Sequence, residues 1–75
     1  MQRKMEKYFI SIKEFVQGNI TDSYTDDNRN KGYSIDEARE VIRKIDEKDP
    51  LRGGDGEPLQ GTEAYICNWN GEKVS

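Results

Sequence analysis

The chain has 75 residues, with 32% apolar residues, 36% charged residues and a net charge of −3. These values predict one small domain with a thin hydrophobic core. Histidine is absent, which excludes Cys-His and Ser-His catalysis and every metal site that uses histidine. Cys67 is the single cysteine, so no internal disulfide can form, and no apolar run reaches the length of a membrane span or signal-peptide core. We therefore expect a reducing, cytoplasmic location.

The N-terminal part of the chain predicts a β-hairpin. Residues 1–6 are expected to be a disordered lead-in to a single domain that spans 7–75. From Lys7 to Phe15, aromatic and β-branched residues are dense and favour a strand. An alternative is a strand that breaks into a short helix over residues 11–17, because Ser11 and Glu14 have the spacing of a capping box. A turn at 17–19 and a second strand over 20–24 complete the hairpin, before a polar loop over 25–31.

The segment from Ser34 to Glu47 predicts an amphipathic helix. Ser34 and Glu37 have the spacing of a capping box, and Glu40 and Arg43 can pair on the polar face. Pro50 ends the helix near residue 48. Apolar residues recur at helical spacing and form one stripe, which is expected to pack on a sheet: Ile35, Ala38, Val41, Ile42 and Ile45.

The C-terminal part of the chain predicts one long loop and a second hairpin. Residues 49–61 hold four glycines and both prolines, which is typical of a loop. Residues 62–69 alternate and predict a strand. Asn70-Gly71 predicts a two-residue type I′ turn, with a return strand over 72–75. The expected fold is α+β, a ββαββ chain that forms a small antiparallel sheet of three to four strands with one helix packed on one face.

The last of these strands also predicts a binding face. If Ala64 and Ile66 point toward the helix, the alternate side chains lie on the opposite, uncovered face of the sheet. Exposed aromatic side chains on such a face are typical of protein interfaces. The alternative is an inverted register, in which these aromatic side chains form the core. The residues predicted to bind a partner are Tyr65, Cys67, Trp69, Phe9 and Phe15.

Two other segments suggest ligands. In the predicted glycine-rich loop, backbone N–H groups and one cation can hold a small anion such as a nucleotide, although the lysine and hydroxyl of a P-loop are missing. The residues concerned are Arg52, Gly53, Gly54 and Gly56. A second pattern partly matches the calcium loop of an EF-hand, with oxygen-bearing residues at positions 1, 3, 5, 9 and 12. These are Asp26, Asn28, Asn30, Ser34 and Glu37.

The calcium pattern departs from an EF-hand in two ways. Gly32 lies at position 7 instead of 6, and no incoming helix precedes the loop. We therefore predict no metal site, and a calcium-dependent structural module stays an alternative only.

No catalytic motif emerges, so the chain is not expected to be an enzyme or to need a cofactor. Basic residues are not clustered with aromatic ones, so direct nucleic-acid binding is not expected either. In length, acidity and expected element order the chain is similar to small phage-encoded or mobile-element inhibitors such as anti-CRISPR proteins. That resemblance includes no shared motif and carries no residues over. With the aromatic strand face, the prediction is a non-enzymatic module that occupies the surface of a protein partner and acts as a homodimer. The alternative is a protein that sequesters a small anion.

Overall fold

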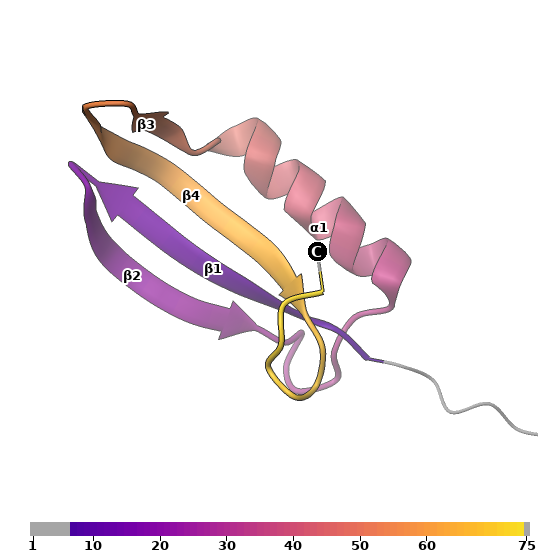
Figure 1. Cartoon of the computed structure of the whole chain (residues 1–75). Helices are drawn as coiled ribbons and strands as arrows, with labels where there is room; N and C mark the ends of the chain where they lie inside the picture. The colour runs from indigo at the N-terminus through magenta and orange to yellow at the C-terminus, as the bar shows by residue number, and fades with distance from the viewer. Residues whose placement is uncertain (1–6, 75) are drawn as a thin grey trace, which may run out of the picture.

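The computed structural model describes residues 7–74 and shows a four-stranded antiparallel sheet with one helix packed on it (Figure 1). The strands lie in the order β2-β1-β4-β3. The predicted α+β fold class and the packing of the helix on the sheet are confirmed, while the predicted lead-in over 1–6 lies outside the described residues. The elements are β1 (Phe9–Val16), β2 (Asn19–Asp26), α1 (Ile35–Lys48), β3 (Arg52–Gly54) and β4 (Glu57–Cys67).

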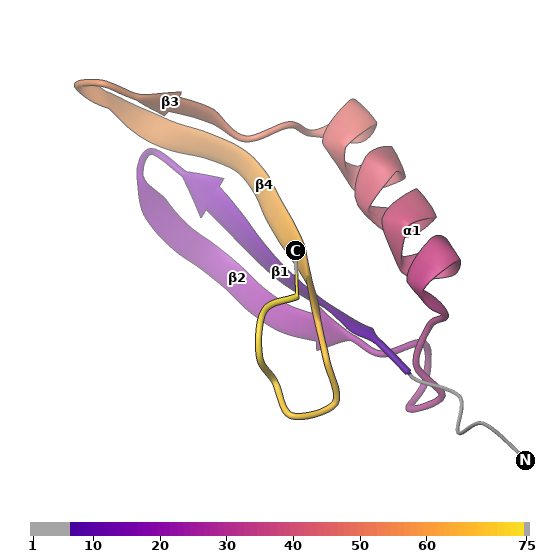
Figure 2. The same cartoon turned by 45° about the vertical axis from the view of Figure 1, so that its right-hand side comes forward.

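The core lies between α1 and the two central strands, as Figure 2 shows from the side. Ile10 and Ile12 of β1 are buried together with Ile66 of β4, because Ile10 lies directly opposite Ile66 in the antiparallel register. Ala38 is the only fully buried residue of the helix. Its small side chain lets the helix axis approach the sheet closely at this point.

The helix begins and ends where its sequence signals predict. The Ser34 hydroxyl accepts a hydrogen bond from the Glu37 backbone N–H at 3.2 Å, and the Glu37 carboxylate accepts one from the Ser34 N–H at 3.1 Å. This capping box satisfies two N–H groups that would otherwise have no partner. On the exposed side, Arg43 pairs with both Glu40 and Glu47 at 2.6 Å, and such exposed pairs add little stability.

The first hairpin is longer than predicted. β1 runs without a break to Val16, so the alternative of a short helix over residues 11–17 is wrong. Gln17 and Gly18 have φ values of 54° and 81°, the positive pair that a two-residue type I′ turn requires. β2 follows directly at Asn19 and extends to Asp26, because it pairs with β1 along its whole length.

The predicted loop over residues 49–61 is wrong, because most of it forms a second hairpin. Asp55 and Gly56 have φ values of 51° and 94° and connect Gly54 of β3 to Glu57 of β4. Asp-Gly is a type I′ turn signal as strong as Asn-Gly, but the surrounding glycines and prolines hide it. The fourth strand of the sheet is therefore β3, and β4 begins five residues earlier than the predicted strand at 62.

The turn at the C-terminal end also differs from the prediction. Asn70 does not have a positive φ, so Asn70-Gly71 is not a type I′ turn. Instead Trp69 and Asn70 are the central residues of a turn in which the Gly71 N–H donates to the Asn68 carbonyl at 2.9 Å. The Asn68 side-chain oxygen also accepts from the N–H groups of Asn70 and Glu72, so Asn68 organises this turn.

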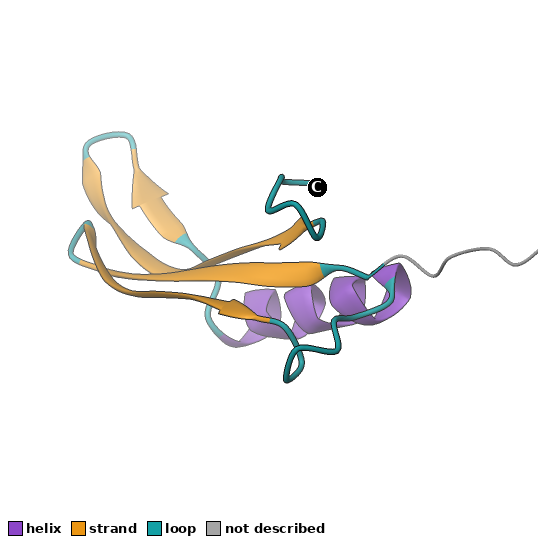
Figure 3. Ribbon diagram, turned by 90° about the horizontal axis from the view of Figure 1, so that it is seen from below, coloured by secondary structure: helices purple, strands orange, loops and turns teal. Residues whose placement is uncertain are grey.

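The predicted return strand over 72–75 is reduced to a single bridge. Lys73 pairs with Cys67, and the Val74 N–H donates to the Ile66 carbonyl at 2.7 Å. Figure 3 shows this segment folding back beside the end of β4. Ser75 lies outside the described residues.

Gly61 of β4 lies against the backbone of residues 50–51, which connect α1 to β3. Gly61 is buried and has φ +114°, and a Cβ atom there would overlap the carbonyl oxygen of Pro50 and lie 3.0 Å from Leu51 Cα. Next to it the Thr62 hydroxyl donates to the Asp49 carboxylate at 2.8 Å, and the Thr62 N–H donates to the Asp49 carbonyl at 3.0 Å. These contacts hold the end of α1 against β4.

We expect Gly61→Ala to destabilise the protein more than Gly71→Ala. Both glycines have positive φ, so each substitution incurs a conformational cost of about 1–2 kcal/mol. Gly71 has open space around it, whereas Gly61 has none, and overpacking adds about 1–3 kcal/mol. Urea unfolding followed by far-ultraviolet circular dichroism measures both. Equal midpoints for the two variants would show that β4 does not need the close approach.

Candidate functional site

The face of the sheet turned away from α1, hereafter the open face, is the candidate site. Because residues directly opposite in an antiparallel pair share a face, the register of β1 with β4 fixes its members. Phe9 lies opposite Cys67, and Ser11 lies opposite Tyr65. Four of the five predicted partner-binding residues are therefore strand residues of this face: Phe9, Phe15, Tyr65 and Cys67.

The alternative of an inverted register is wrong. Ile66 and Ala64 pack beneath the helix with Ile10 and Ile12, which turns Tyr65 to the other side. A shift of one residue would exchange all of these side chains between the core and the open face.

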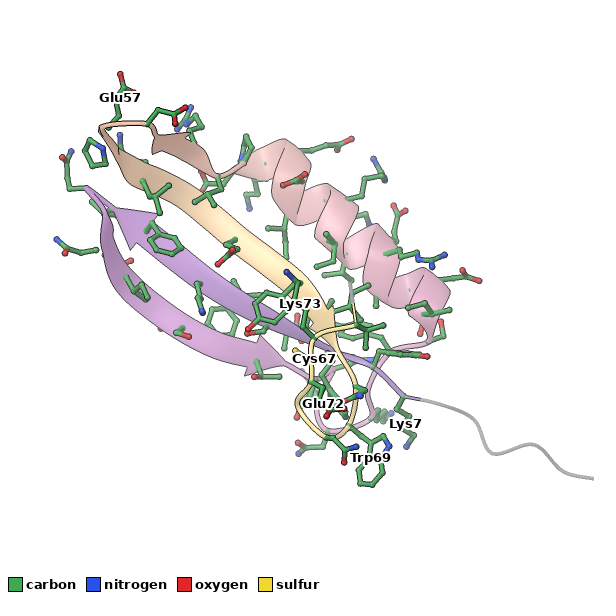
Figure 4. All side chains as sticks on the ribbon, in the orientation of Figure 1. Lys7, Glu57, Cys67, Trp69, Glu72 and Lys73 are labelled. Carbon is green, nitrogen blue, oxygen red and sulfur yellow. The ribbon has the colours of Figure 1, made fainter. Side chains whose placement is uncertain are left out.

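A shallow groove of about 280 Å³ lies at the end of the open face where β4 stops. Trp69 flanks it and is 76% exposed, the most exposed large apolar side chain of the described chain. The prediction that Trp69 ends the strand is wrong, because β4 stops at Cys67 and Trp69 lies in the following turn. Figure 4 shows its side chain pointing away from the sheet at this end of the molecule. The groove is lined by Phe9, Ser11, Thr25, Tyr65, Cys67, Asn68, Trp69 and Gly71.

The C-terminal segment covers part of this end of the open face. The Lys73 ammonium lies 5.3 Å from the centre of the Tyr65 ring, within the range of a cation–π contact. Cys67 beside it is only 8% exposed, so its thiol offers little surface to a partner. Phe9, Tyr65 and Trp69 are therefore the predicted residues that the structure brings together.

Phe15 lies apart from this group. It is six residues from Phe9 along β1, a separation of about 20 Å in an extended strand. Lys13 and Glu63, which lie opposite each other, separate the two ends of the face. The neighbour of Phe15 is Ile20, which is 55% exposed and was not predicted to belong to this face.

A bulge in β2 explains why Ile20 was missed. The register of β2 against β1 shifts between Glu14 and Phe15, so that Asp22 lies opposite Glu14 but Ile20 lies opposite Phe15. Thr21 is the extra residue. Simple alternation places Ile20 on the same face as Asp22, and only the bulge turns it over.

The residues predicted to hold an anion are strand and turn residues. Arg52 and Gly54 pair with β4, and Asp55 and Gly56 form the type I′ turn between the strands. Gly53 is a bulge whose Cα lies close to the Pro58 backbone. The segment is therefore a hairpin instead of the predicted loop.

The residues of the calcium pattern also have other partners. Ser34 and Glu37 bond to each other in the capping box, and Asp26 accepts a hydrogen bond from the Asn28 N–H at 3.1 Å. Asn28 and Asn30 have positive φ, which asparagine tolerates, so the segment makes a tight left-handed turn. Over residues 7–74 no cluster of three acidic or cysteine side chains is arranged to hold a metal ion.

This turn is anchored by a tyrosine. The Tyr33 hydroxyl donates to the Asp26 carboxylate, and burial, this hydrogen bond and the nearby charges of Asp26, Asp27 and Glu37 raise the pKa of Tyr33 to about 12. Tyr33 also packs against the core and bridges to Tyr8 through two backbone hydrogen bonds of 2.8 Å. It therefore ties the turn to the start of β1.

Comparison with known proteins gave no matching family model, no similar curated protein and no similar solved structure. Among the described residues no helix is both long and apolar enough to cross a membrane. The geometry of the open face is therefore the basis on which a function can be argued.

We expect the stability of the protein to fall above pH 10 more steeply in the wild type than in Tyr33→Phe. A folded-state pKa of about 12 against an ordinary value of 10 means that the stabilisation is fully present below pH 10 and is lost as pH rises to 12. One such group contributes a slope of at most about 1.4 kcal/mol per pH unit. Urea unfolding at pH 8, 10 and 11 measures this slope, and parallel slopes for both proteins would show that the pKa of Tyr33 is not raised in the folded state.

Proposed function

We propose that the protein is a non-enzymatic protein-binding module whose recognition surface is the groove end of the open face, with Phe9, Tyr65 and Trp69 as its apolar contacts. The observation that carries the proposal is Trp69, which is 76% exposed beside a groove lined by two more aromatic side chains. A large exposed apolar side chain at a concave site is a feature of binding surfaces.

The surroundings of these three residues support the proposal. Ser11 and Thr25 line the same groove and supply hydroxyl groups, and Lys73 lies over the Tyr65 ring at its border. Aromatic contacts surrounded by polar groups match the usual arrangement of a protein interface, in which a few Trp and Tyr residues contribute most of the binding energy.

Charge and size support a particular mode of action. The net charge of −3 favours association with a basic protein surface and increases the rate of encounter. A rigid sheet of this size acts on such a partner by covering part of its surface, as an inhibitor does. The alternative is that the same residues of the open face join two copies of the chain in a homodimer.

We expect Trp69→Ala to lose partner binding without loss of fold. A central Trp typically contributes at least about 2 kcal/mol, which corresponds to a loss of affinity of about 30-fold. Because Trp69 lies in an exposed turn, the Trp69→Ala variant should keep a circular dichroism spectrum and an unfolding midpoint close to those of the wild type. The measurement is affinity capture from a lysate of the source cells, with the captured protein then titrated against each variant by calorimetry.

Val16→Ala is the control, since Val16 is 52% exposed at the other end of β1, outside the groove, and should keep wild-type affinity. Equal affinity of the wild type and Trp69→Ala would overturn the proposal. Sedimentation velocity tests the homodimer alternative. If the wild type is a dimer, Trp69→Ala is a monomer and the lysate yields no captured protein, the open face serves self-association.

A further inference from the structure

Within the described part of the chain, residues 7–74, no strand pairs with the outer edge of β2. β2 is the terminal strand of the order β2-β1-β4-β3 and runs for eight residues, all exposed except Asp26, which is half-buried. At the opposite edge of the sheet β4 pairs with β3 and, at its other end, with the segment around Lys73. In the described chain β2 is thus the one long strand whose outer edge has no other element beside it, although its Ser23 N–H donates to the Asp22 carboxylate of the same strand at 3.0 Å.

β2 lacks two of the features that usually prevent a second strand from pairing, lysine and proline, although it carries the carboxylates of Asp22 and Asp26. Edge strands are commonly protected by lysine, by proline or by shortness. β2 has neither lysine nor proline, and its bulge lies near its start at Thr21. From Asp22 to Asp26 the register against β1 is regular, so five consecutive residues present a straight edge.

The side chains along this edge indicate the charge of an occupant. Asp22, Tyr24 and Asp26 lie on one face of β2, and Glu14 of β1 lies directly opposite Asp22. β2 itself carries no cation. Burial and the charges of these three carboxylates raise the pKa of Tyr24, in agreement with a local excess of negative charge.

The helix leaves room on this face. α1 packs over β4 and the near side of β1, so Tyr24 stays 46% exposed. A groove of about 280 Å³ lies between Tyr24 and the end of the helix, where Lys48 is accompanied by the carboxylates Glu14 and Asp49. Side chains of an added strand that point to this face therefore meet an open, mainly acidic surface beside an aromatic ring.

A second copy of the chain is a poor occupant. Antiparallel pairing of β2 with β2 of another molecule around Tyr24 would place Asp22 of each copy against Asp26 of the other. Like charges directly opposite each other in a sheet are destabilising. A strand with lysine or arginine at alternate positions instead gains charge pairs at Asp22 and Asp26 and a cation–π contact at Tyr24.

We propose that the β2 edge binds an extended, cationic segment of another protein, which adds to the sheet as a fifth strand next to β2. Main-chain hydrogen bonds supply affinity in this mode, and alternate side chains supply specificity. The site goes beyond the proposed function: Thr25 belongs to both surfaces, but the edge includes none of the aromatic residues Phe9, Tyr65 and Trp69.

The test uses a capped heptapeptide of alternating valine and lysine, titrated into the ¹⁵N-labelled full chain and followed by amide chemical shifts at low salt. We expect saturable shifts along 22–26 and none with the peptide in which glutamate replaces lysine. Asp22→Asn/Asp26→Asn should weaken binding about 3- to 10-fold, as expected for two exposed charge pairs. Asparagine at 26 keeps an oxygen that accepts from Asn28 and Tyr33, so the turn is preserved.

Asp46→Asn/Asp55→Asn is the matched control, because it removes the same charge away from β2 and asparagine tolerates the positive φ of residue 55. It should bind as the wild type does. Trp69→Ala should also bind the peptide with wild-type affinity, because Trp69 is not part of the β2 edge. The β2-edge proposal can therefore be tested even if the open-face proposal fails.

N-methylation of the peptide distinguishes strand addition from charge attraction alone. A strand faces β2 with only one of its two edges, so methylating one alternate set of amides should abolish binding and methylating the other set should not. Equal binding of both methylated peptides would overturn strand addition. A dimer in sedimentation velocity, with β2 amides protected from hydrogen exchange in the absence of peptide, would assign the edge to a second copy and overturn the proposal as well.

Discussion

The contact between Ala38 and the central strands is the constraint on which the arrangement of the molecule depends. Ala38 is completely buried against a cluster that includes Ile10, Ile12 and Ile66. In a chain with so few apolar residues, this small cluster is where burial of apolar surface can offset the loss of chain entropy. It fixes which side of β1 and β4 faces the helix, and therefore which side remains open to a partner.

The size of the helix explains why the sheet keeps unfilled surfaces. A single helix with its side chains is about 10–12 Å wide, whereas four strands about 4.8 Å apart span more than that. α1 therefore covers β4 and part of β1, and leaves β2 uncovered on the helix side. Within residues 7–74 no second layer covers the opposite side, apart from the short C-terminal segment at Tyr65. The two proposed binding surfaces both result from this shortage of covering elements.

Turn chemistry sets the lengths of the strands. Gln17-Gly18 and Asp55-Gly56 have the positive φ pairs of type I′ turns, and each continues the pairing of its flanking strands to the last residue. At Gly61 the absence of a side chain lets the chain at Pro50 cross against β4. The four glycines of residues 49–61 suggest a flexible loop by their number. In the structure they instead allow the β3–β4 hairpin and the close contact between Pro50 and β4, because both need positive φ or close backbone approach.

The sequence by itself determined the helix and its capping box at Ser34 and Glu37, because these follow from local hydrogen bonds and from the period of the apolar residues. It predicted a first hairpin and the alternation of residues 64–67, but it left open a short helix over 11–17 and which face of the sheet is buried. It also indicated Phe9 and Tyr65 as members of one surface. Only the tertiary structure decided the rest. The bulge that turns Ile20 beside Phe15 and the close approach of Pro50 to Gly61 depend on register and on contacts between distant segments, and local periodicity contains no information about either. The Asp55-Gly56 hairpin and the Asn68 turn that carries Trp69 out of the strand are local, but they follow from turn chemistry, which the period of the apolar residues does not reveal.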